Sequence, residues 1–169
     1  SIFQFLATHA IEGLDQDVQE ILVKTSILAD ISVTLAEGLT NSPKAGEVLR
    51  SLYLVRHFIE RRDEPELWYR YHPLFRDFLL ERLAARYSVD EVRNLRRQAA
   101  IRLAEVGQYE ESIVQLRQAE DWTAMAGQII ALAPAVLGQG RLATVDEWIS
   151  AIPKHVLEGN PWLRFWHAC

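Results

Sequence analysis

The chain has 169 residues, of which 49% are hydrophobic and 24% are charged, and its formal net charge is −5. This composition is ordinary for a globular protein, and the negative charge disfavours extended binding to nucleic-acid phosphates. No apolar run reaches the roughly 18–20 residues that a membrane-spanning helix needs, and no secretion signal is present. Its single cysteine, Cys169, excludes an internal disulfide. We therefore expect a cytoplasmic protein that does not contact a membrane.

The first half of the chain predicts three helical segments and a hairpin. Apolar residues spaced along one helical face predict a helix over residues 15–29, followed by a short apolar segment that stops near Gly38. In "NSPKAGEVLRSLYLV", Ser42 is a candidate N-cap and Pro43 a candidate first residue of the next helix. Alternating Val, Phe, Ile, Trp and Tyr in "LVRHFIERRDEPELWYRY" then predict a β-hairpin around a polar turn.

The hairpin is followed by an amphipathic helix that begins at Pro73. One side of this helix is expected to carry the apolar residues Leu74, Phe75, Phe78, Leu79 and Leu83. Three helices, a hairpin and a closing helix are the elements of a winged-helix domain, which we assign to residues 1–88.

Residues 89–169 read as helical throughout. "SVDE" at 88–91 and "TVDE" at 144–147 match capping boxes, and Pro134 is expected to end the helix that contains Trp122. Gly107 and Gly140 lie 33 residues apart, and each precedes a new helix by two residues. This half is therefore predicted to form TPR-like helical hairpins at the start of an α-solenoid. The predicted fold class is mostly α, a winged-helix domain followed by helical repeats.

Catalytic and metal-binding patterns are weak. The five histidines show neither the spacing of metal ligands nor nearby cysteines, and no serine has the glycine neighbours of a nucleophile. "GLTNSPKAG" lacks both the glycine before Lys44 and the Ser or Thr after it that a phosphate-binding loop requires. We predict no catalytic residue and no metal site.

Three sets of side chains have alternative interpretations. The hairpin arginines Arg56, Arg61, Arg62 and Arg70 could contact DNA, but carboxylates interleave with them and favour a solvated surface. The arginines near residue 88 form either a solvated helix face or an interface to an acidic domain of the same polypeptide: Arg82, Arg86, Arg93, Arg96, Arg97 and Arg102. The tryptophans of the second half are expected to pack between helices, with a ligand or partner groove as the alternative: Trp122, Trp148, Trp162 and Trp166.

The segment "WYRYHPLFRDFLLERL" resembles a known family, as do "VQEILVKTSIL", "GQYEESIVQLRQAEDW" and "GRLATVDEWISAIP" in the same order. The chain is similar to the large MalT-like, ATP-dependent transcriptional regulators of the LuxR type, which belong to the signal-transducing ATPases. In that family a nucleotide-binding domain comes first, followed by a winged helix, inducer-sensing helical repeats and a C-terminal DNA-binding unit. The resemblance implies that this chain is the regulatory middle part and not an enzyme in itself.

The same resemblance gives His72 a role. In the superfamily, the histidine of a Met-His-Asp motif on the winged helix contacts the phosphates of bound ADP and holds the inactive state. His72 in "YHPLF" matches that histidine by position, whereas Tyr71 and Pro73 replace its neighbours. A ring N–H beside the unpaired amides of a helix start suits a phosphate oxygen. A histidine that only packs against the hairpin is the alternative.

These implications define the expected partners. ATP or ADP would bind in the full-length parent and not in this fragment, whose winged helix would contact the nucleotide-binding domain of the same polypeptide. An inducer, either a small molecule or a protein, would bind the repeats, and the active parent would be able to oligomerise. Two other functions remain possible from the sequence: a TPR-like protein-interaction scaffold without a nucleotide role, and a DNA-binding winged-helix protein.

Overall fold

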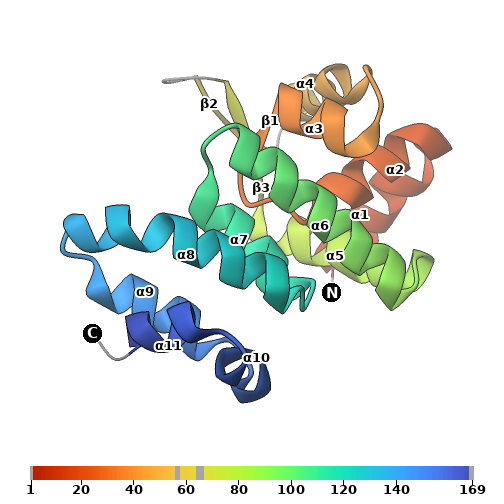
Figure 1. The fold of residues 1–169 in the computed structure, drawn as a ribbon. Coiled ribbons are helices and arrows are strands. Elements are labelled where there is room, and N and C mark those ends of the chain that lie inside the picture. The colour runs from red at the N-terminus through yellow and green to blue at the C-terminus, as the bar shows by residue number, and fades with distance from the viewer. Residues whose placement is uncertain (1, 56–57, 64–66, 168–169) are drawn as a thin grey trace.

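The computed structural model describes residues 2–55, 58–63 and 67–167, and it describes side chains for 7–54, 58–63 and 67–165. These residues form two lobes: a first lobe of helices around a small sheet, and a second lobe of helices alone (Figure 1). The first lobe comprises α1 (Ile2–Glu12), α2 (Gln16–Thr25), β1 (Ile31–Ser32), α3 (Val33–Thr40), α4 (Ala45–Val55), β2 (Ile59–Arg62), β3 (Trp68–Tyr71) and α5 (Pro73–Arg86). From α2 onward this is the element order of a winged-helix domain.

The predicted hairpin is confirmed as β2 and β3, which pair antiparallel with Ile59 opposite Tyr71. The structure adds a strand that the sequence did not reveal. β1 pairs antiparallel with the other edge of β3, so that Ile31 lies opposite Tyr69 and the strand order is β1-β3-β2. A strand of two residues has no alternation of its own, and it forms because β3 offers it a hydrogen-bonding edge.

The core of the first lobe lies between the sheet and the surrounding helices. Tyr69, Phe75 and Leu22 are each at most 2% exposed. Tyr71 is also buried, and its hydroxyl lies 2.8 Å from Oγ1 of Thr25, so each buried hydroxyl has a partner. Burial raises the pKa of Tyr71 well above its usual value. The predicted apolar side of α5 is largely confirmed, except that Leu74 is 54% exposed.

The second lobe consists of α6 (Val89–Glu105), α7 (Tyr109–Gln118), α8 (Trp122–Gly138), α9 (Leu142–Ser150), α10 (Lys154–Glu158) and α11 (Pro161–His167). Helices α6 to α9 pack consecutively against one another, α11 packs against α8, α9 and α10, and α8 to α11 extend away from the first lobe (Figure 1). Their shared core includes Met125, Ile129 and Ile149. The predicted mostly α fold, a winged helix followed by helical hairpins, is therefore confirmed.

Two glycines end helices in the same way. Gly107 and Gly140 have φ of +78° and +75°, a conformation that a side chain disfavours. The next amide closes the helix in each case: Gln108 N donates to Leu103 O at 2.8 Å, and Arg141 N donates to Val136 O at 3.2 Å. These are Schellman ends, and the predicted 33-residue correspondence marks two equivalent turns.

Local signals at helix ends were partly misleading. The capping box at Ser88 and Glu91 is confirmed in both directions. The second box is wrong, because α9 begins at Leu142 and already contains Thr144. Pro134 does not end its helix either; it lies on the exposed side within α8, which continues to Gly138. The helix expected from Pro43 begins at Ala45, although Ser42 Oγ still accepts from Lys44 N at 3.3 Å.

Helix α6 belongs to both lobes. Its Ala99 and Leu103 lie in the core of the first lobe, where α6 packs against α3. Ala100, on the adjacent face of the same helix, lies in the core of the second lobe. The expected boundary at residue 88 stays a prediction, and the packing shows that the helix after this boundary completes the core before it.

Replacing a helical glycine with alanine is expected to change stability in opposite directions at two positions, Gly46 and Gly127. A Cβ at Gly46 in α4 would lie 2.7 Å from Cγ1 of Val33 in α3, so the two helices would have to separate. We expect Gly46→Ala to lower the free energy of unfolding by about 1–3 kcal/mol. Gly127 in α8 has open space around it, and Gly127→Ala should raise stability by about 0.5–1 kcal/mol. Urea denaturation measures both changes; equal shifts for the two variants would contradict the close approach of α3 and α4.

Candidate functional site

His72 is the N-cap residue of α5, immediately after β3, and its side chain is exposed. Its backbone is fixed on both sides: His72 N donates to Phe58 O at 2.8 Å, and Arg76 N donates to His72 O at 2.9 Å. Pro73 follows at the first helical position, where the missing amide costs no helical hydrogen bond. The structure thus places the predicted phosphate-contacting ring on the surface, and its contact with a nucleotide stays a prediction.

The first turn of α5 also carries a side chain that reaches another element. Arg76, four residues after His72, is half-buried and reaches the end of α2. Its Nε donates to Ser26 O at 2.8 Å, and its Nη2 donates to Ile27 O at 3.0 Å. A guanidinium that holds two carbonyls in a fork fixes the start of α5 relative to α2.

The same Ile27 carbonyl receives a second donor from the other lobe. Gln115 in α7 is 1% exposed, and its Nε2 donates to Ile27 O at 2.8 Å and to Glu111 Oε1 at 3.0 Å. Arg96 in α6 donates to Oε1 of Gln115 at 2.9 Å. We call this group of side chains and carbonyls the seam: Ser26, Ile27, Arg76, Arg96, Glu111 and Gln115. It joins α2, α5, α6 and α7.

The electrostatics of the seam centre on Arg96. Burial lowers the pKa of Arg96, the nearby positive charge of Arg76 lowers that pKa further, and Glu111 opposes both effects. The Gln115 amide lies between these groups and bonds directly to Ile27, Glu111 and Arg96. Since buried polar groups are costly to leave unpaired, the seam favours one relative placement of the lobes.

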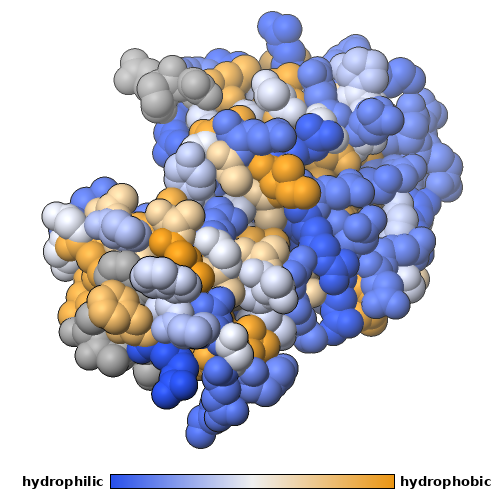
Figure 2. Space-filling model, in the orientation of Figure 1, coloured by the Kyte–Doolittle hydropathy of each residue, from blue (hydrophilic) through white to orange (hydrophobic). Residues whose placement is uncertain are grey.

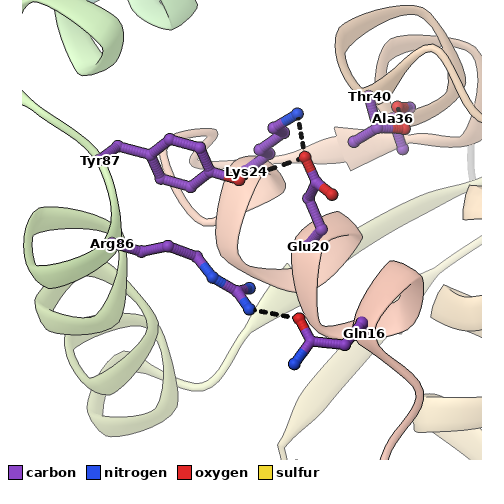
Figure 3. Close-up of polar contacts among 7 residues, drawn as sticks. All are labelled: Gln16, Glu20, Lys24, Ala36, Thr40, Arg86 and Tyr87. Atoms are coloured by element: carbon purple, nitrogen blue, oxygen red, sulfur yellow. Dashed lines mark hydrogen bonds and ion pairs between the residues drawn. The ribbon is translucent and has the colours of Figure 1, made fainter.

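A second set of contacts fixes the link between α5 and α6 (Figure 3). Arg86 Nη2 donates to Gln16 Oε1 at 2.6 Å, and the Tyr87 hydroxyl donates to Glu20 Oε1 at 3.2 Å. Glu20 also pairs with Lys24, one turn along α2. Partial burial raises the pKa of Tyr87. The chain therefore enters α6 from a link that is attached to α2.

The arginines near residue 88 largely find partners within the chain. Arg82 pairs with Glu12, Arg93 with Glu120, and Arg97 with Asp121, whose other oxygen caps α8. The remaining Arg102 lies across Gly38 of α3, where a Cβ would approach its Nη1 to 2.7 Å. In the structure Arg82 links α5 to α1, whereas Arg93, Arg97 and Arg102 hold α6 against its neighbours. An acidic partner domain for them stays untested.

Three of the cations that could face DNA are engaged internally, whereas Arg62 of the hairpin is exposed. Arg70 forms a bidentate salt bridge with Asp30, with both hydrogen bonds at 2.9 Å. Arg61 pairs with Asp63, and Lys44 pairs with Asp17 at 3.0 Å. Arg56 lies outside the described residues. Paired cations release fewer counterions from a phosphate backbone, so this surface offers weak support for DNA binding.

The tryptophans of the second lobe differ in their environments. Trp148 is 9% exposed and Trp122 half-buried, both against the second core, as expected for packing between helices. Trp162 is 63% exposed, so core packing is wrong for this residue, and the side chain of Trp166 lies outside the described residues. Figure 2 shows hydrophobic residues gathering on the second lobe, whereas hydrophilic residues cover most of the visible first lobe.

The sequence analysis named His72, whose role stays a prediction, and did not identify Arg76 or Gln115. Gln115 has one usable signal, since it interrupts an apolar face formed with Ile113 and Leu116. Its partner lies 88 residues away, which no local pattern reveals. Among the residues that the structure describes, no cluster of His, Cys, Asp or Glu could hold a metal ion, and no helix could cross a membrane.

Together, the fold and the seam define a winged-helix domain joined through one shared helix to stacked helical hairpins. The family model of the MalT winged helix domain matches residues 7–91, which is half of the chain. The chain therefore belongs to the MalT winged helix domain family.

Three relatives extend this likeness over nearly the whole chain. The HTH-type transcriptional regulator MalT of Serratia proteamaculans (strain 568) is 26% identical over 164 residues, covering 97% of this chain and 18% of the relative. MalT of Vibrio campbellii (strain ATCC BAA-1116) is 25% identical, with 99% and 19% covered. MalT of Klebsiella pneumoniae (strain 342) is 26% identical, with 93% and 17% covered. The chain thus spans about a fifth of the length of these curated relatives.

Proposed function

We propose that this chain is the regulatory middle part of a MalT-like, LuxR-type, ATP-dependent transcriptional regulator that acts in the cytoplasm. In this function the winged helix responds to the nucleotide, and the TPR-like repeats bind an inducer that is either a small molecule or a protein. ADP held between the nucleotide-binding domain and His72 favours the inactive state. ATP and inducer favour the active, oligomerising state.

The observation that carries this proposal is the arrangement around the first turn of α5. His72 faces outward at the start of this turn, and Arg76 reaches the seam from its end. From the other lobe, Gln115 binds the same Ile27 carbonyl as Arg76. A shift of α5 on nucleotide release would therefore disturb a hydrogen-bond network that includes α7. Coupling between the nucleotide site and the repeats requires an element that is linked to both, and the first turn of α5 meets this requirement.

The internal pairing of Lys44, Arg61 and Arg70 is a reason to propose regulation by this winged helix rather than direct DNA reading. Catalysis is not part of the proposal for this chain. In the parent protein, ATP binding and turnover would belong to the nucleotide-binding domain.

Removing the imidazole tests the nucleotide role. In the full-length regulator, His72→Ala should speed ADP release by roughly tenfold or more, because a hydrogen bond to a charged group contributes about 1.5–3 kcal/mol. Basal transcription without inducer should rise accordingly. Stopped-flow release of a fluorescent ADP analogue and a reporter assay measure the two effects.

The matched control is His155→Ala, which removes an exposed histidine from α10 in the second lobe. It should leave both ADP release and basal transcription unchanged. If the His72 variant releases ADP at the rate of the control, the histidine has a packing role only.

A further inference from the structure

An apolar groove of the first lobe is lined by residues other than His72 and those of the seam. It has a volume of about 450 Å³ and lies between α1, α2 and α4. Its apolar lining includes Val18 and Leu22 of α2, Val48 and Leu52 of α4, and Phe58 before β2. Four of these side chains are only half-buried although they belong to the edge of the first core: Val18, Val48, Leu52 and Phe58.

The position of the groove in the fold matters for what it can bind. Helix α4 occupies the place that a recognition helix has in DNA-binding helix-turn-helix proteins, where polar and basic side chains meet the major groove. Here α4 turns Val48 and Leu52 toward the groove, with Ser51 exposed beside them. An apolar surface on this helix suits an apolar partner surface rather than base edges and phosphates.

The rim of the groove is negatively charged. Among the described residues that line it, Asp15, Asp17 and Glu47 meet a single cation, Lys44, which is paired with Asp17. The pKa of Lys44 is raised by Asp17 first, and Asp15 and Glu47 raise it further, so all three carboxylates act on the same rim. Because one ammonium faces three carboxylates, the rim attracts a cationic partner.

We propose that this groove docks an amphipathic helix of another protein, with an apolar face that enters the groove and lysine or arginine residues along its flanks. Helix-in-groove recognition uses this combination of an apolar floor and charged edges. A second copy of this chain is a poorer match, because its formal net charge is −5. The proposal does not depend on the nucleotide role of His72.

Two synthetic helices serve as probes in a fluorescence anisotropy titration with the 169-residue chain. Both carry a leucine face; one has lysine flanks and the other glutamate flanks. We expect the lysine probe to bind and the glutamate probe to bind at least about tenfold more weakly, since like charges oppose each other across an interface. Equal binding of the two probes would overturn the proposal.

Variants of exposed residues locate the binding. Glu47→Lys at the rim and Ser51→Lys in the groove should each weaken the lysine probe by about tenfold or more. Glu81→Lys, the matched charge reversal on the exposed side of α5, should leave its affinity within about twofold. Circular dichroism confirms that all three variants are folded. Loss of affinity in all three variants alike would indicate only a general charge effect and would overturn the groove assignment.

Self-association is a distinct outcome. If sedimentation shows a dimer of the unmodified chain that Ser51→Lys dissociates and Glu81→Lys does not, the groove belongs to a second copy, and docking of another protein is wrong. A monomer at all concentrations, together with selective binding of the lysine probe, supports the proposal.

Discussion

Leu103→Ala is expected to lower the free energy of unfolding by about 2–5 kcal/mol, the range for a leucine truncated in a well-packed core. Leu103 is 1% exposed and lies in the core of the first lobe, although its helix, α6, follows the winged-helix elements in the chain. The cavity would open where α6 packs against α3. Guanidinium denaturation followed by circular dichroism measures the loss, and Trp68 fluorescence reports the first lobe directly.

The matched control for this variant is Ile101→Ala, two residues earlier on the same helix. Ile101 is 61% exposed, so its truncation should change stability by no more than about 0.5 kcal/mol. Similar losses of unfolding free energy for both variants would mean that α6 contributes to stability through its helical propensity and not through the packing of Leu103. A small loss for Leu103→Ala would show that the first lobe does not need this helix.

Gln115→Leu is the second substitution with a large expected effect. Leucine has a similar size but can neither accept from Arg96 nor donate to Glu111, so both would lose a partner, and Ile27 O would keep Arg76 as its donor. We expect a loss of about 1–3 kcal/mol in the free energy of unfolding. The unfolding transitions of the two lobes should also separate, because the seam is their shared polar contact.

Fluorescence from single-tryptophan backgrounds distinguishes the two lobes. A chain that keeps only Trp68 reports the first lobe, and a chain that keeps only Trp148 reports the second. The control is Gln118→Leu, on the exposed side of α7, which should leave both transitions coincident. Coincident transitions in Gln115→Leu with unchanged stability would show that the seam does not couple the lobes.

The sequence predicted well what depends on neighbouring residues. The capping box at Ser88 and the helix ends at Gly107 and Gly140 are formed by residues within one turn, so their patterns are sufficient. The β2–β3 hairpin and the buried face of α5 were likewise found from the spacing of apolar residues.

The errors have physical reasons of their own. Thr144 has the residues of a capping box, but the turn at Gly140 starts α9 earlier and places Thr144 inside the helix. Pro134 is tolerated because it lies on the exposed side of α8, where water can satisfy a freed carbonyl. Leu74 has helical spacing but lies outside the buried sector of α5.

Of the residues in the candidate site, only the exposed His72 was predicted. His72 was identified from a resemblance, and the structure adds its exposure and its N-cap position. Arg76 and Gln115 bind carbonyls 49 and 88 residues away in the chain, so their partners follow from the assembled fold alone. Every residue type has a backbone carbonyl, so the type of the partner residue does not reveal a long-range contact of this kind. For this reason the seam was missed.

The membership of α6 in both cores limits how relatives can exchange parts. A recombinant that joins one regulator's winged helix to another's repeats directly before Val89 would separate α3 from the helix that evolved against it. Ala99 and Leu103 would then come from the foreign parent and meet an unmatched surface. A crossover after Glu105, in the turn at Gly107, keeps Ala99 and Leu103 with the first core but separates Ala100 from the second core. Viable chimaeras are therefore expected to need an α6 that matches both of its neighbours, wherever the junction lies.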